Sequence, residues 1–127
     1  WEVKVDTIHE LIGRTIVHAD CSVGSDVARF NLDDGRVCRF WHDDDCCEDV
    51  RIEDVIGDIA DLVGSPLVLA EEVSEADGPT VEHVDSYTWT FYRFATAKGT
   101  VTIRWLGTSN GYYSESVSWE ITRCGAR

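Results

Sequence analysis

The sequence predicts an α+β fold: a single domain, residues 1–127, in which a mostly antiparallel sheet of about six to eight strands packs against one main helix. Short β-branched and aromatic segments recur along the chain, separated by turn residues. Apolar residues fall at helical spacing mainly near residues 54–63. A chain of 127 residues is long enough for one hydrophobic core and too short for two comfortable ones.

The first expected element, after a possible arm at residues 1–6, is a short N-terminal helix. Thr7 can cap this helix, Glu10 stands three residues later as in a capping box, and Gly13 can end it. Residues 15–19 are rich in β-branched side chains and predict the first strand.

Residues 26–42 form the clearest hairpin, around the turn sequence Asp-Asp-Gly at 33–35. A two-residue turn would pair Phe30 with Arg39, whereas a three-residue loop would pair Phe30 with Cys38. The longer loop gathers the apolar residues on one face of the hairpin. We therefore expect the three-residue loop, with Cys38 buried.

The main helix is expected at about 54–63, where apolar residues recur on one face and acidic residues take the other. A brief strand at 50–52 precedes it, and Gly64 followed by Pro66 is a typical helix stop. Gly57 lowers the helix propensity by about 1 kcal/mol relative to Ala, so we expect an irregular first turn.

The next segment consists of a short strand followed by an acidic connection. Residues 67–70 predict a short apolar strand. Residues 71–85 contain many acids and a Gly-Pro pair, which predicts an exposed loop. Near the C-terminus, residues 115–122 alternate between apolar and polar side chains, as in a half-buried strand.

Two long segments, 86–96 and 100–106, are rich in threonine and aromatic residues and predict a second hairpin. A two-residue turn around positions 98 and 99 would pair Phe94 with Ile103. Trp89 would then lie on the opposite face of this hairpin, where it needs cover. The main helix is the expected cover.

The chain is strongly acidic, with 24 Asp and Glu residues against 11 Lys and Arg residues and a formal net charge of −13. Such a charge repels nucleic acid and anionic lipid, so we expect neither direct nucleic-acid binding nor membrane association. No segment approaches the roughly 20 consecutive apolar residues of a membrane-spanning helix. The expected partner is a protein with a basic surface. The simpler alternative is that the charge serves solubility alone.

The five cysteines do not have the spacing of a disulfide framework, because their number is odd and two of them are adjacent. This usage predicts a reducing cytoplasm in which most thiols act as small buried hydrophobic groups. The cysteines are Cys21, Cys38, Cys46, Cys47 and Cys124.

The segment 42–48 contains every type of ligand that zinc uses. The two separated pairs of a structural zinc site are absent, and adjacent cysteines point in opposite directions in an extended chain. A site would therefore need a tight turn and a distant ligand such as His18 or His83. The alternative is a solvated acidic bend with one cysteine in the core. The candidate metal ligands are His42, Asp45, Cys46, Cys47 and Glu48.

The segment 107–116 has the Tyr, Ser, Gly and Asn composition of adaptable binding loops. Two adjacent tyrosines cannot both face the core from an extended segment, so we expect at least one to be exposed. The alternative is a long hairpin connection with one tyrosine packed on the sheet. The candidate contact residues are Asn110, Tyr112, Tyr113 and Glu115.

No catalytic constellation is evident in the sequence. It contains no Gly-x-Ser-x-Gly elbow, P-loop or Gly-x-Gly-x-x-Gly motif. A cysteine nucleophile near His42 is disfavoured, because the surrounding acids raise a thiol pKa. We therefore expect a non-enzymatic protein without a cofactor, a divalent metal being the alternative.

Several segments together resemble a family of small uncharacterised proteins that bacteriophages and prophages mainly encode. The family has a His-x-x-Asp-Cys-Cys-Glu segment, matched at 42–48, and a Ser-Asn-Gly-Tyr-Tyr-Ser segment, matched at 109–114. The family carries no assigned activity. The further matching segments cover 11–17, 52–67, 70–74, 87–96 and 101–105.

The resemblance implies a phage-encoded protein in the cytoplasm of a bacterial host cell. Together with the charge, it predicts an accessory protein that binds a host or phage protein through its acidic surface and the 107–116 loop. One alternative is a metal-binding protein, or a metal-dependent hydrolase, that uses the 42–48 cluster. Another is a DNA mimic that inhibits a DNA-binding protein.

Overall fold

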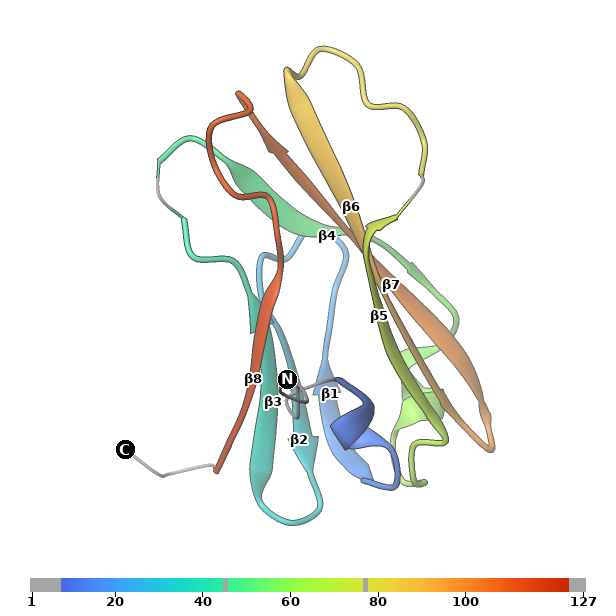
Figure 1. The fold of residues 1–127 in the computed structure, drawn as a ribbon. Helices are drawn as coiled ribbons and strands as arrows, with labels where there is room; N and C mark the ends of the chain where they lie inside the picture. Colours follow the sequence, from blue (N-terminus) through green and yellow to red (C-terminus); the bar gives the residue numbers. More distant parts are fainter. Residues whose placement is uncertain (1–7, 45, 77, 124–127) are drawn as a thin grey trace, which may run out of the picture.

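In the described part of the chain, eight strands pair into two four-stranded antiparallel sheets (Figure 1). The structure is a computed structural model in which residues 8–44, 46–76 and 78–123 are described. In spatial order, the first sheet contains β1 (Ile16–Asp20), β2 (Ala28–Leu32), β3 (Arg36–Trp41) and β8 (Ser118–Arg123). The second contains β4 (Asp49–Ile56), β7 (Gly99–Ser109), β6 (Ser86–Thr96) and β5 (Leu69–Ala76).

An aromatic cluster joins the two sheets into a sandwich. Phe30 of β2 meets Phe94 of β6 with ring centroids 5.1 Å apart, and Phe40 of β3 meets Tyr92 of β6 at 4.9 Å. All four side chains are essentially buried. Each edge-to-face pair adds about 0.5–1.5 kcal/mol beyond the burial of its apolar area.

The α+β prediction is wrong, because the described part of the chain contains no α-helix. Its helical turns are two 3₁₀ helices of four residues each, η1 (Ile8–Leu11) and η2 (Ile59–Leu62). The expected N-terminal helix is thus the single turn η1, and Thr7 and the arm at 1–6 lie outside the described residues. No helix in 8–44, 46–76 or 78–123 has the length and apolar character needed to cross a membrane.

The expected main helix at 54–63 is divided between a strand and a turn. Its first three residues extend β4 and pair with β7, so their backbone groups bond to a neighbouring strand. Gly57 then adopts a φ of +112°, and a Cβ there would lie 2.5 Å from the carbonyl oxygen of Thr100. Only glycine fits this position readily. Asp58 accepts a hydrogen bond from the Ala60 N–H at 3.0 Å and starts η2.

The acidic segment 71–85 was expected to be a loop, but its first part is strand. Residues 71–76 belong to β5 and pair with β6, and the described residues 78–85 of the connection to β6 have no regular structure. This connection supplies the cover that Trp89 needs. The indole Nε1 of Trp89 donates to the carbonyl of Pro79 at 3.0 Å, and the Arg104 guanidinium lies 4.9 Å from the ring centre.

The strand register was predicted correctly for the first hairpin and wrongly for the second. Phe30 pairs with Cys38, which confirms the three-residue loop and the burial of Cys38. In the second hairpin Phe94 pairs with Val101, so the expected partner Ile103 is wrong by two residues. A slip of two residues leaves every side chain on its expected face, because the strand period is two.

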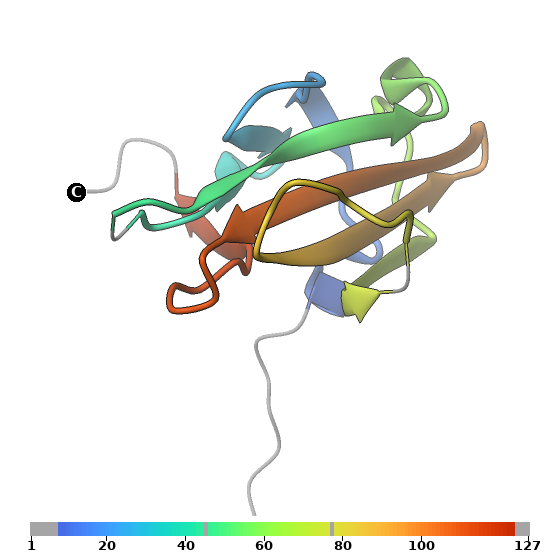
Figure 2. The same cartoon turned by 90° about the horizontal axis from the view of Figure 1, so that it is seen from above.

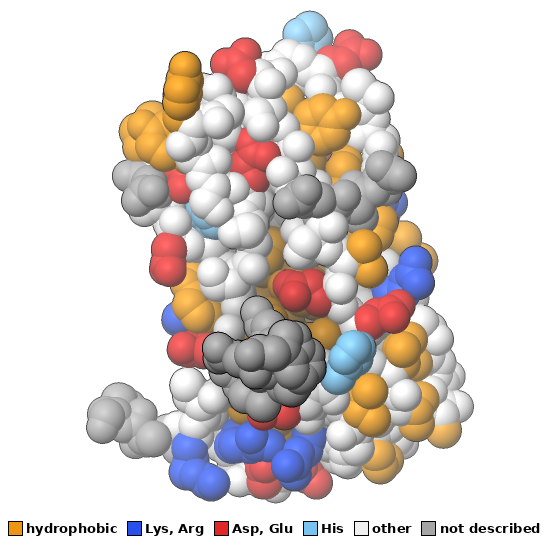
Figure 3. Space-filling model, viewed as in Figure 1, with side chains coloured by type: hydrophobic (Ala, Val, Ile, Leu, Met, Phe, Trp, Pro, Cys, Tyr) orange, Lys and Arg blue, Asp and Glu red, His pale blue; other side chains and the backbone are white. Residues whose placement is uncertain are grey.

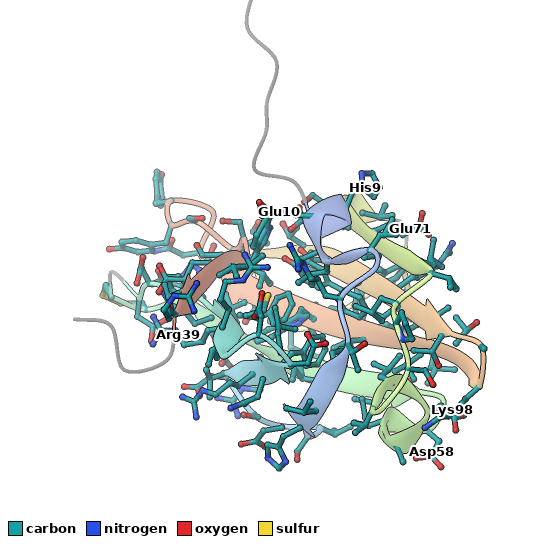
Figure 4. The ribbon with its side chains drawn as sticks, turned by 90° about the horizontal axis from the view of Figure 1, so that it is seen from below. His9, Glu10, Arg39, Asp58, Glu71 and Lys98 are labelled. Carbon is teal, nitrogen blue, oxygen red and sulfur yellow. A yellow bond between two sulfur atoms is a disulfide. The ribbon has the colours of Figure 1, made fainter. Side chains whose placement is uncertain are left out.

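Three loops gather at one end of the sandwich (Figures 1 and 2). We call this surface the loop end; it consists of residues 42–48 between β3 and β4, 78–85 between β5 and β6, and 110–117 between β7 and β8. The β6–β7 turn and η2 lie at the opposite end, where Figure 4 labels Lys98 and Asp58. There the Lys98 Nζ donates to the carbonyl of Val63 at 2.6 Å.

Candidate functional site

The loop end carries acidic charge without fixed positive charge. Its three loops contain no lysine or arginine. In Figure 3 the main group of Lys and Arg side chains on the visible face lies toward the opposite end, where Arg14 and Arg36 pair with Asp34. A basic partner would therefore be drawn to the loop end. The acidic residues of the three loops are Asp43, Asp44, Asp45, Glu48, Glu82, Asp85 and Glu115.

Tyr112 stands at the tip of the 110–117 loop with 89% of its surface exposed. Gly111, at a φ of +95°, turns the chain just before it. The Asn110 side chain then accepts a hydrogen bond from the Tyr112 N–H at 3.0 Å and fixes the turn. Tyr113 is half-buried, so the expectation that at least one of the two tyrosines is exposed is confirmed.

An open hollow of about 250 Å³ lies between the three loops. Cys47, His83 and Asn110 each contribute to it from a different loop, together with Val84 and Asp85. His83 is the only described non-glycine residue with a positive φ, 68°. The hollow therefore brings residues of all three loops together on one surface.

His42 and Glu48 form a buried pair in the 42–48 loop. The His42 Nε2 lies 2.9 Å from a Glu48 carboxylate oxygen, and the two side chains are 4% and 0% exposed. The other Glu48 oxygen accepts a hydrogen bond from the Cys46 N–H at 3.0 Å. Asp44 stands at the open side of this pair, 65% exposed and 3.9 Å from His42 Nε2.

The protonation of His42 follows from its two neighbours. Its Nδ1 lies 2.6 Å from the carbonyl oxygen of Ser116, and a carbonyl only accepts, so Nδ1 carries a proton. A proton on Nε2, when the ring is charged, is donated to the Glu48 carboxylate. Burial lowers the pKa of His42, but the hydrogen bonds to Glu48 and Ser116 and the charges of Glu48 and Asp44 raise it more, so its pKa lies above the ordinary value.

Glu115 is the second buried acid of the loop end. Its carboxylate accepts hydrogen bonds from the Thr88 hydroxyl at 2.7 Å and from the Ser109 hydroxyl at 2.5 Å. Burial raises the pKa of Glu115, but the hydroxyl groups of Ser109, Thr88 and Ser86 lower it more, so the pKa lies below its usual value. Glu115 was expected to be a contact residue, but it is buried and holds the base of the loop instead.

The residues 115 and 116 connect the two sheets at the loop end. Glu115 reaches Thr88 of β6 and Ser109 of β7 in the second sheet, while the Ser116 carbonyl accepts from His42, which follows β3 of the first sheet. The base of the 110–117 loop is thus fixed on both sides. Its exposed tip, with Tyr112, is displayed from a rigid support.

The expected metal ligands converge only in part. Among the described residues, one oxygen or nitrogen atom from each of His42, Asp44 and Glu48 lies within 4.8 Å of the others. Asp45 lies outside the described residues, and the group includes neither His18 nor His83. Asp44 was missed, although residues two apart share one side of an extended segment and this spacing could have indicated it.

Among the described residues, the cysteines contribute no thiol to this group, and Cys124 lies outside the described part of the chain. Cys46 and Cys47 are exposed and joined to each other in a disulfide, which was not expected for a reducing cytoplasm. Burial raises the pKa values of Cys21 and Cys38 to about 12, so both remain neutral thiols. Neither has the properties of a nucleophile.

Comparison with known proteins identifies a family and gives no activity. A family model described as "Domain of unknown function (DUF7448)" matches residues 9–119. The searches of curated proteins and of solved structures gave no match. The match covers β1 to β7, the three loops of the loop end and the first two residues of β8.

Proposed function

The chain belongs to the DUF7448 domain family, and because that description names no activity, we propose from its own surface that it is a binding protein. Its loop end would contact a host or phage protein that has a basic surface. The observation that carries the proposal is Tyr112, which is 89% exposed on a loop whose base is fixed to both sheets.

The geometry supports a contact site because it combines an aromatic anchor with a preorganised support. Tyrosine has few rotatable bonds and buries a large area on binding. The hydrogen bonds of Glu115 and of Ser116 fix the loop before any partner arrives, so little ordering entropy is lost on binding. Val84 and Tyr87, each 37% exposed, supply further apolar surface near this end.

Charge indicates the kind of partner. The net charge of −13 and the absence of lysine and arginine from the three loops favour a basic protein surface over a nucleic acid or an anionic membrane. The segments at 42–48 and 109–114 resemble those of phage and prophage proteins. We carry that resemblance into the proposal: the protein is phage-encoded and acts in the cytoplasm of a bacterial host without catalysing a reaction.

The test compares two exposed residues at opposite ends of the molecule. The full chain, Tyr112→Ser and the control Val68→Ser, whose residue is 63% exposed near the β6–β7 end, are used to capture proteins from a bacterial lysate. We expect a basic protein that binds the wild type and Val68→Ser, with affinity reduced at least about tenfold by Tyr112→Ser. A partner that binds all three equally, or no specific partner, contradicts the proposal.

The DNA-mimic alternative predicts a different result in the same assay. A mimic occupies the DNA-binding face of its partner, so DNA competes with the protein and its affinity falls steeply with salt. A partner that is not displaced by DNA excludes the mimic and leaves the loop-end contact in place.

A further inference from the structure

We propose that His42, Asp44 and Glu48 bind one divalent transition-metal ion of the zinc class. The ligands would be His42 Nε2 and one carboxylate oxygen from each acid, with water at the remaining position. The proposal does not rest on the binding function of the loop end. It replaces the expected His-Asp-Cys-Cys-Glu set by a nitrogen and oxygen site.

The orientation of the imidazole is the first support. The Ser116 carbonyl accepts the Nδ1 proton at 2.6 Å and so directs the lone pair of a neutral ring at Nε2 toward Glu48. Histidines that bind metals are held in this way, by a hydrogen bond from the second ring nitrogen to a carbonyl or carboxylate. Ser116 lies outside the ligand group and 74 residues along the chain, so this bond is independent of the acidic cluster.

The spacing of the ligand atoms fits a small ion. Ligands lie about 2.0–2.2 Å from zinc, so two of them stand about 3.3 Å apart around a tetrahedral ion. The distances from Nε2 are 2.9 Å to Glu48 and 3.9 Å to Asp44. The Asp44 side chain is 65% exposed, so it can move closer to Nε2. Nε2 and the Glu48 oxygen need to move apart only slightly.

The charge of the ligand set suits a dication. Two carboxylates and one neutral imidazole together carry two negative charges, which a divalent ion balances. Exposed acids alone would not select a metal, but the imidazole and the Glu48 carboxylate, whose side chain is 0% exposed, provide a defined, partly dehydrated site.

The test uses protein that has been treated with a chelator and titrated with zinc chloride by calorimetry. We expect one ion per chain, and affinity reduced at least about tenfold in Glu48→Gln and in Asp44→Asn. Asp44 is exposed and its substitution leaves the buried pair intact, so unfolding does not explain a loss there. Matched controls are Asp43→Asn, which removes a neighbouring exposed acid, and His83→Gln, which removes a histidine that is 93% exposed.

Thiol binding is excluded by a double variant, Cys46→Ser with Cys47→Ser, which should bind zinc as the wild type does. Cobalt substituted for zinc should show ligand-field absorption without the intense thiolate-to-cobalt band. The proposal is overturned if wild type binds no zinc, if Asp44→Asn binds as tightly as wild type, or if the serine variant loses the ion.

Discussion

Glu48 and Glu115 are both about 8% exposed and lie at the same end of the sandwich, yet different kinds of partner hold them. Glu48 faces the Nε2 atom of an imidazole, and the exposed carboxylate of Asp44 lies 3.9 Å from the same nitrogen. Glu115 faces neutral hydroxyl groups, those of Ser109, Thr88 and Ser86. A carboxylate that faces an imidazole nitrogen can share a metal ion with it, whereas one that hydroxyl groups satisfy is already complete.

At the loop end, Glu115 has a structural role, whereas Glu48 and His42 form the proposed ligand site. Glu115 connects the 110–117 loop to the second sheet and offers nothing to a ligand. The His42–Glu48 pair connects the same loop to the first sheet through the Ser116 carbonyl and leaves an open side at Asp44. A metal bound there would stiffen the base of the loop that displays Tyr112. Substitutions can therefore remove the contacts of Glu48 and those of Glu115 separately.

The largest expected effect comes from Gly107→Ala, which disturbs the Glu115 side alone. A Cβ at residue 107 would lie 2.4 Å from the carbonyl oxygen of Glu115 and 2.8 Å from its Cβ, so the backbone itself must shift. We expect the free energy of unfolding, measured with urea, to fall by about 3 kcal/mol. The control is Gly99→Ala, whose Cβ would meet only the end of the Asp61 side chain. Equal losses in the two variants would contradict the close packing at Glu115.

A smaller loss is expected from Glu115→Ala, which removes the acceptor for these hydroxyl groups. Hydrogen bonds to charged groups contribute about 1.5–3 kcal/mol, and water can replace part of this, so we expect a loss of about 2 kcal/mol. The matched control is Glu120→Ala. Its carboxylate is 48% exposed and 3.9 Å from Arg39, and an exposed pair of this kind contributes less than about 1 kcal/mol. If Glu120→Ala lowers the free energy of unfolding by as much as Glu115→Ala does, Glu115 does not hold the base of the loop as we describe.

The two acids should respond to pH in opposite directions. The pKa of Glu115 is lowered in the folded protein, so its contribution is present above the ordinary glutamate pKa and is lost as the pH falls through the folded value. The pKa of His42 is raised, so the contribution of its pair with Glu48 is present below the ordinary histidine pKa and is lost as the pH rises through the folded value.

Unfolding measured in a chelator tests these signs. The stability difference between wild type and Glu115→Gln should shrink from pH 6 toward acid, whereas that between wild type and Glu48→Gln should shrink from pH 6 toward alkali. Glutamine at residue 48 can donate to a neutral imidazole and still accept from the Cys46 N–H, but it cannot stabilise an imidazolium. If both stability differences changed with pH in the same direction, the hydrogen-bond partners assigned to Glu48 and Glu115 would be wrong.

The strands were predictable from the sequence and the helix was not, for one physical reason. Each of the eight strands overlaps a segment that was expected to be a strand, because alternation of apolar and polar residues survives small errors of register. The pattern at 54–63 imitates a helix because the end of β4 and the turn η2 place their apolar residues in succession. Gly57 marks the boundary with its φ of +112°, whereas in the sequence this glycine predicted only an irregular first helical turn.

The sequence pointed to the segment of the proposed metal site but not to its full ligand set. His42 and Glu48 belong both to the expected ligands and to the group that converges in the structure, whereas Cys46 and Cys47 pair with each other and Asp44 joins the group. The partner that orients the imidazole is a main-chain carbonyl at Ser116. Every residue has such a carbonyl, so no sequence pattern could identify this one before the fold brought β3 and β8 together.

The smallest expected effect on stability is that of Tyr112→Ser. Tyr112 is 89% exposed and forms none of the core contacts, so we expect the free energy of unfolding to change by less than about 0.5 kcal/mol. Because the base of the loop rests on Glu115 and Ser116, removal of the tip leaves both buried acids in place. Thermal and urea unfolding of this variant should match those of the wild type. A loss comparable to that of Glu115→Ala would mean that Tyr112 packs on the molecule, and its exposure would then no longer support a contact role.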